Sequence, residues 1–128
     1  MSTAMNRSSD SPRIGFVFTG QGAIWAKVAL ELCVYPCFIR SLKEAELYFQ
    51  SLNCAWKVTG EYTVPSVAQC LYVVDELFKE PEESTVYRSE YSQPLTTIIQ
   101  IALVDLLHSF CIKPTVVVGH SSGEIAAA

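Results

Sequence analysis

Ser121 lies at the centre of the pentapeptide Gly119-His120-Ser121-Ser122-Gly123, which has the Gly-x-Ser-x-Gly pattern of a nucleophile elbow. Three valines before the pentapeptide predict a strand, and the Glu-Ile-Ala-Ala-Ala segment after it predicts a helix. The motif requires this order, because the serine must sit at the tip of a sharp strand-to-helix turn. The two glycines lack a Cβ atom and relieve the crowding that such a turn creates. We therefore interpret Ser121 as a nucleophile.

The residue after this serine has a predicted role of its own. The backbone N–H of Ser122 is expected to donate a hydrogen bond to the oxyanion that forms on an attacked acyl carbon. A helix beginning at about Ser122 would direct its N–H groups and partial positive charge to the same place. The alternative is that the pentapeptide is only a glycine-containing turn, and the flanking strand and helix patterns weigh against it.

The composition indicates a folded domain and excludes several classes of function. Half of the 128 residues are hydrophobic and 17% are charged, which is typical of a chain with a packed core. A net charge of −4 without a basic stripe argues against nucleic-acid binding, and no apolar run approaches the roughly 20 residues of a membrane span. Five cysteines without a completed ligand pattern predict no metal site. They indicate free thiols in a reducing compartment, so we expect a cytoplasmic protein.

The elements that must position the serine begin after residues 1–12, which we predict to be a disordered lead. An apolar run over residues 13–19 predicts a buried parallel strand, and Gly20-Gln21-Gly22 ends it before a helical stretch at residues 23–32. A glycine-rich turn between a strand and a helix is also found in dinucleotide-binding folds. The third glycine of that motif is missing here, so no bound cofactor is expected.

Three further helical patterns follow before the elbow. The first is amphipathic and opens at Tyr35-Pro36, the second ends near Pro81, and the third runs from about Leu95 to Phe110 with apolar residues over most of its surface. His108 falls on the polar side of the third helix, which predicts a surface histidine. A strand at residues 115–118 then enters the elbow. This order predicts an α/β fold with a parallel sheet and a site at the carboxyl ends of the strands.

With both glycine motifs in view, the chain resembles the malonyl-CoA:acyl-carrier-protein transacylase family. It is most similar to the acyltransferase domains of fungal-type reducing polyketide synthases. Four segments in the expected order carry the resemblance: Phe16-Val17-Phe18-Thr19-Gly20-Gln21-Gly22-Ala23, the Tyr35-Pro36 helix with Ser41-Leu42 and Glu44-Ala45, Tyr91-Ser92-Gln93-Pro94-Leu95, and Val116 to Ala128. The resemblance implies that residues 13–128 form a partial acyltransferase domain. They would be the N-terminal part of its α/β-hydrolase-like subdomain, with an incomplete parallel sheet and without the ferredoxin-like subdomain.

The resemblance also implies a reaction and its participants. In this family a serine attacks the thioester of an acyl-CoA, of malonyl type here, and the phosphopantetheine thiol of an acyl carrier protein domain then takes the acyl group. Ser121 would be the nucleophile, and the backbone N–H groups of Gln21 and Ser122 would form the oxyanion hole. Gln93 matches the family's buried glutamine near the site, with a positioning role, and His120 would line the acyl pocket. Other polyketide synthase domains would be further partners.

The chain departs from the family pattern in three places. The family's general-base histidine and its carboxylate-binding arginine lie beyond Ala128, so the chain is expected to be inactive alone. Ile24 stands where the family usually has a glutamine, which we expect to be tolerated. Residues 58–73 have no counterpart in the pattern, and they are either a genuine insertion or an in-frame retained intron.

Two other functions stay open at this stage. A serine esterase of the α/β-hydrolase type has the same elbow, although the Gly-Gln-Gly and Ser-Gln-Pro-Leu segments do not belong to its signature. A non-catalytic remnant that only docks with a carrier protein or a partner synthase is the third possibility.

Overall fold

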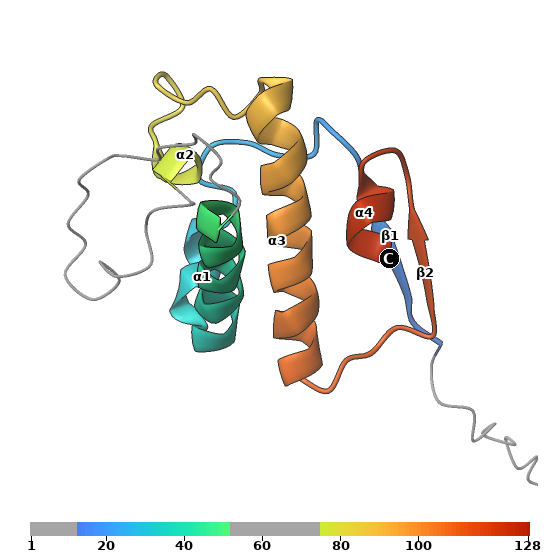
Figure 1. Ribbon diagram of the computed structural model, residues 1–128. Helices are drawn as coiled ribbons and strands as arrows, with labels where there is room; N and C mark the ends of the chain where they lie inside the picture. Colours follow the sequence, from blue (N-terminus) through green and yellow to red (C-terminus); the bar gives the residue numbers. More distant parts are fainter. Residues whose placement is uncertain (1–12, 52–74) are drawn as a thin grey trace, which may run out of the picture.

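The computed structural model describes residues 13–51 and 75–128 (Figure 1). The predicted lead at residues 1–12, the stretch at residues 58–73 and most of the second helical pattern lie outside this part. Its elements in chain order are β1 (Gly15–Phe18), the 3-10 helix η1 (Leu30–Val34), α1 (Pro36–Ser51), α2 (Asp75–Phe78), α3 (Ser89–Ser109), β2 (Val116–Gly119) and α4 (Gly123–Ala127).

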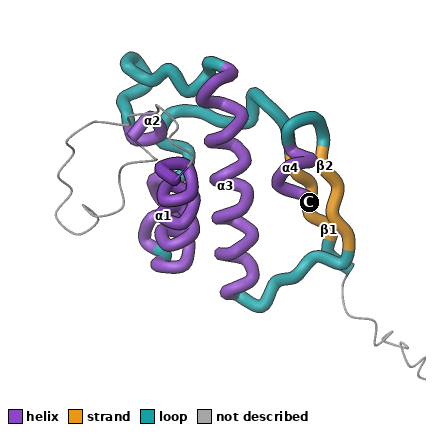
Figure 2. The backbone as a smooth tube through the Cα atoms, in the orientation of Figure 1, coloured by secondary structure: helices purple, strands orange, loops and turns teal. Residues whose placement is uncertain are grey.

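The two strands pair in parallel and form a small sheet. Gly15 aligns with Val116 at one end, and Phe18 aligns with Gly119 at the other. Because the strands are parallel, the loop after β1 and the turn after β2 leave the sheet at the same edge (Figure 2). The predicted α/β fold with a parallel sheet is confirmed.

The core lies between α1 and α3, which stand side by side (Figure 1). Phe38 and Leu42 of α1 are buried, as the amphipathic pattern predicts. Their partners are apolar residues of α2, of α3 and of the loop between α2 and α3: Leu77, Val86, Leu95, Ile98, Ile99, Ala102 and Leu106. Each such side chain contributes about 1.5–3 kcal/mol when it is removed from water. Of the helices that the structure describes, none combines the length and apolar composition that crossing a lipid bilayer requires.

Two helix predictions need correction. Helix α3 begins at Ser89 rather than at about Leu95, and Pro94 lies inside it. The N–H groups of Tyr91 and Ser92 both bond to the Arg88 carbonyl, so the first turn forms upstream of the proline. Pro94 then removes only one hydrogen bond near the helix start.

Residues 23–32 do not form the predicted helix. They run through turns until η1 begins at Leu30. Lys27 has a φ of 66°, in the left-handed region, which a continuous helix does not allow. Its N–H donates to the carbonyl of Leu77, so a tertiary contact replaces the local helical bond. Ile24 is buried in the core, where an apolar side chain needs no hydrogen-bond partner.

The segment that leads into α3 is organised around the buried carboxylate of Glu76 in α2. Its Oε1 atom accepts hydrogen bonds from the Thr85 N–H, the Thr85 hydroxyl at 3.0 Å and the Ser84 hydroxyl at 3.2 Å. Lys79 bonds to the other carboxylate oxygen at 2.5 Å. These contacts outweigh the opposing effect of burial and hold the pKa of Glu76 below its usual value of 4.5.

One face of the sheet is apolar and exposed. Successive strand residues point to opposite faces, so Val17, Val116 and Val118 share a face according to the register. Their exposed fractions are 72%, 64% and 56%. Phe18, on the opposite face, is buried.

Candidate active site

The elbow adopts the backbone conformation that its pattern predicts. Ser121 has a φ of 55°, in the left-handed region that a non-glycine residue enters at a cost of about 1–3 kcal/mol. Surrounding bonds hold it there: the His120 N–H donates to the Phe18 carbonyl at 3.0 Å, and the Glu124 N–H donates to the Ser121 carbonyl at 3.1 Å. The turn therefore presents Ser121 at the carboxyl edge of the sheet, and its side chain is exposed.

Neither elbow glycine, Gly119 or Gly123, has room for a Cβ atom. A Cβ atom at Gly119 would lie 2.5 Å from the Glu124 Cα and 2.8 Å from the Gly123 carbonyl carbon. A Cβ atom at Gly123 would lie 2.7 Å from the Thr19 oxygen and closer still to the Phe18 oxygen. The crowding predicted across the turn is confirmed, and Gly123 also allows the elbow to pack on the end of β1. Helix α4 begins at Gly123, with Ser122 at the N-cap position.

The loop after β1 meets the nucleophile directly. A Cβ atom at Gly20 would lie 3.0 Å from the Ser121 Cβ and 3.4 Å from the Ser121 Oγ. The parallel pairing of β1 and β2 brings the Gly-Gln-Gly loop and the elbow together, although about a hundred residues separate them. This places Gln21 one residue from a direct neighbour of the serine. The oxyanion roles of the Gln21 and Ser122 N–H groups stay predictions.

Side chains of α3 reach the same loop. The Gln93 Nε2 donates to the Gln21 Oε1 at 3.1 Å, and the Gln21 Nε2 donates to the Ser89 hydroxyl at 2.9 Å. The Gln100 Nε2 donates to the Thr19 carbonyl at 2.8 Å. Gln93 is exposed, rather than buried as the resemblance implies, and so is its hydrogen-bond partner Gln21.

Sequence reasoning missed Ser89 and Gln100. Their spacing from Gln93, four residues back and seven residues on, puts all three on one face of a helix. That signal was present in the sequence, but it becomes informative only once the loop on which this face packs is known.

Neither histidine of the chain is placed as a partner of the serine hydroxyl. His108 is exposed near the carboxyl end of α3, as predicted for a surface residue, whereas the elbow lies level with the other end of that helix (Figure 1). His120 is exposed and precedes Ser121 on a sharp turn, where neighbouring side chains diverge. Its predicted role in lining the acyl pocket stays a prediction.

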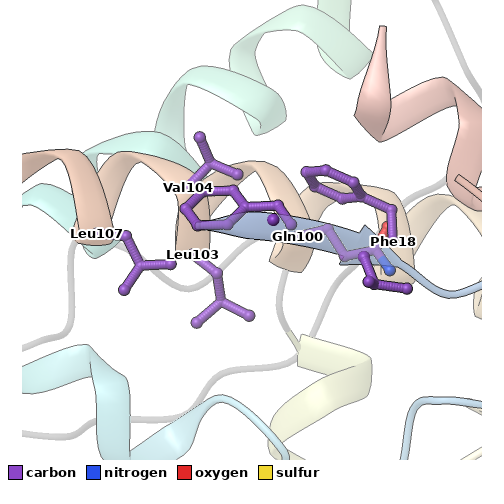
Figure 3. A pocket seen from close by; sticks show the side chains of 8 residues that line it. Phe18, Gln100, Leu103, Val104 and Leu107 are labelled. Carbon is purple, nitrogen blue, oxygen red and sulfur yellow. The ribbon is translucent and has the colours of Figure 1, made fainter. Parts of the chain in front are cut away.

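A groove of about 230 Å³ runs between β1 and α3 (Figure 3). Its lining is mostly hydrocarbon and comprises Gly15, Phe16, Val17, Phe18, Gln100, Leu103, Val104 and Leu107. Ser121 and His120 do not line it, so the groove lies beside the nucleophile rather than around it. Within residues 13–51 and 75–128 there is no cluster of three or more metal-ligating side chains, and no disulfide joins Cys33, Cys37 and Cys111.

Comparison with known proteins agrees with this geometry. Residues 15–128 match the acyl transferase domain family. The chain is 48% identical over 123 residues to the highly reducing polyketide synthase Preu1 of Preussia isomera, and 46% identical over 121 residues to the highly reducing polyketide synthase tazB of Aspergillus terreus. These alignments cover 95% and 94% of this chain but only 4% of each relative.

Two solved structures resemble the fold. The acyl transferase domain of ZmaA aligns with a TM-score of 0.69 and 27% identity, over 91% of this chain and 24% of that one. A loading acyltransferase from the avermectin modular polyketide synthase aligns with a TM-score of 0.67 and 29% identity, over 90% of this chain and 31% of that one. The strained serine elbow, the adjoining glycine loop and these matches together show that the chain belongs to the acyl transferase domain family.

Proposed function

We propose that Ser121 carries a malonyl-type acyl group from coenzyme A to the phosphopantetheine thiol of an acyl carrier protein domain in a polyketide synthase. The observation that carries this proposal is the contact between the strained elbow and the Gly-Gln-Gly loop, with the Gly20 Cβ position 3.4 Å from the Ser121 Oγ. This contact supports the proposal that the backbone N–H groups of Gln21 and Ser122 stabilise the oxyanion that forms when the nucleophile attacks.

The reaction comprises two acyl transfers. In the first, the Ser121 Oγ attacks the thioester carbonyl, an ester bond forms, the C–S bond breaks and the hydroxyl proton leaves with the coenzyme A thiolate. In the second, the phosphopantetheine thiol attacks the seryl ester, a new thioester forms, the bond between the acyl carbon and the Ser121 Oγ breaks, and the thiol proton passes to the Ser121 oxygen. Because neither histidine of this chain is placed to take the proton, we expect acylation of the chain alone to be slow and to require prolonged incubation.

The test is the covalent state of Ser121. The purified chain is incubated separately with malonyl-CoA, methylmalonyl-CoA and acetyl-CoA, and intact mass with peptide mapping locates any acyl ester. A loaded sample is then mixed with a phosphopantetheinylated acyl carrier protein to measure transfer. Ser121→Ala should abolish loading, whereas Ser51→Ala, at an exposed position on α1, should load as the wild type does.

Each outcome distinguishes the functions considered. An ester on Ser121 that moves to the carrier protein supports the proposal. Hydrolysis of p-nitrophenyl acetate in preference to any CoA thioester would indicate an esterase instead. No ester on Ser121 after prolonged incubation, together with retained binding to the carrier protein, would indicate a docking fragment.

A further inference from the structure

The loop that carries Gln21 is held from one side by a single helix. Gln100 of α3 bonds to the Thr19 carbonyl at 2.8 Å, at the start of the loop. Ser89 and Gln93 bond to the two ends of the Gln21 side-chain amide, at 2.9 Å and 3.1 Å. Three side chains of α3 thus contact two consecutive parts of one loop.

These three side chains form one stripe along a helix that is anchored in the core. Intervals of four and seven residues put Ser89, Gln93 and Gln100 on the same face of α3. The opposite face of this helix packs in the core, where Leu95 and Ala102 expose 2% and 0% of their surface. A side chain anchored on such a helix has little freedom to follow a moving loop.

The elbow contacts the same loop from the other side. The Thr19 oxygen that accepts the bond from Gln100 also lies against Gly123, where a Cβ atom would approach to 2.7 Å. The Gln100 Oε1 is buried and has no hydrogen-bond partner among the described residues, so the side chain is oriented by its N–H group alone. The Thr19 carbonyl is thus contacted both by α3 and by the elbow that carries Ser121.

We infer that the Ser89, Gln93 and Gln100 stripe of α3 is a brace that sets the position of the Gln21 backbone N–H relative to the Ser121 hydroxyl. Ser89 and Gln100 are thereby positioning residues that act through the loop rather than on the substrate. The catalytic part of this inference rests on the proposed function, because it takes the Gln21 N–H as an oxyanion donor. The bracing of the loop does not depend on it.

The expected effect follows from the geometry of oxyanion holes. Their donors act at about 2.7–3.1 Å from the developing charge, and a misplacement of about 1 Å costs about 10²-fold in rate. Gln100→Met keeps the length of the side chain but removes its donor. We expect it to lower the single-turnover rate constant for Ser121 acylation by malonyl-CoA by about 10- to 100-fold, with the half-saturating concentration unchanged within about twofold.

The experiment combines that rate with a direct measurement of loop order. Backbone ¹⁵N order parameters of Gln21 and Gly22 are measured in the wild type, Gln100→Met and Ser89→Ala. Ser109→Ala is the matched control, because the hydrogen bonds of its hydroxyl to described residues lie at the far end of α3, with the Leu106 carbonyl, and with Cys37. Unfolding midpoints are recorded first. Ser89 is exposed, so Ser89→Ala preserves the test if Gln100→Met does not fold.

Lower order parameters in both brace variants but not in Ser109→Ala, with a lower rate constant at unchanged half-saturation, support the inference. Order parameters equal to those of the wild type in both brace variants would overturn it, whatever the rate does. If the wild-type chain is not acylated at all, the proposed function fails while the order parameters still decide whether α3 braces the loop.

Discussion

Replacement of Gly123 by alanine is a decisive test of how the elbow is built. Gly123 is the first residue of α4, and alanine is the better helix former by about 1 kcal/mol. Local propensity alone therefore predicts that Gly123→Ala stabilises the protein. The tertiary structure predicts the opposite, because the new Cβ atom would enter the backbone at the end of β1.

The size of the clash follows from the positions of three backbone atoms. The Cβ atom would lie 2.7 Å from both the Phe18 carbonyl carbon and the Thr19 oxygen, below the 3.0 Å that real Cβ contacts respect, and nearer still to the Phe18 oxygen. Backbone atoms in a paired strand cannot rotate away as a side chain does. Overpacking of this kind costs about 1–3 kcal/mol, and more where backbone must move.

The assay is urea unfolding with linear extrapolation to zero denaturant. Gly15→Ala, at the start of β1, is the control, because its Cβ atom would make only an ordinary 3.4 Å contact with a Val116 methyl carbon. We expect Gly15→Ala to be neutral or stabilising by about 0.5–1 kcal/mol, and Gly123→Ala to be destabilising by about 2 kcal/mol or more. A Gly123→Ala protein at least as stable as Gly15→Ala would refute the steric reasoning.

Two further predictions concern charge and surface. The pKa of Glu76 in the folded protein lies below 4.5, so its carboxylate contributes fully to stability at pH values above the unfolded-state pKa, and this contribution is lost as the pH falls through the folded-state pKa. Glu76→Gln should therefore reduce the fall in unfolding free energy below about pH 4.5. An unchanged pH profile would contradict this. Val17 and Val118 expose 72% and 56% of their surface on one face of the sheet, so we expect the chain to self-associate through this face. The double variant Val17→Thr with Val118→Thr should shift sedimentation-velocity profiles toward the monomer. Equal association of the wild type and the double variant would count against that face.

Much of the local structure could be predicted from the sequence, because local spacing determines it. The valine run, the Gly-x-Ser-x-Gly pattern and the helix formers after it are adjacent, so the strained turn at Ser121 follows from neighbouring residues alone. The apolar stripes of α1 and α3 likewise follow from helical periodicity, which buries Phe38 and Ala102 as expected. The parallel pairing was predictable as well, since helices separate the two strands.

The tertiary structure alone decided how distant segments meet at the site. The bonds from α3 to the loop at residues 19–21 join residues 68 to 81 positions apart, and no local pattern encodes their partners. Gln93 is exposed beside an exposed Gln21, and the turns at residues 23–32 contain a Lys27 N–H that donates to the distant Leu77 carbonyl. The sequence by itself thus determined that Ser121 is presented on a strained turn. The packing of β1 and α3 around that turn determined which loop and which side chains surround it, because those contacts form only when the chain is folded.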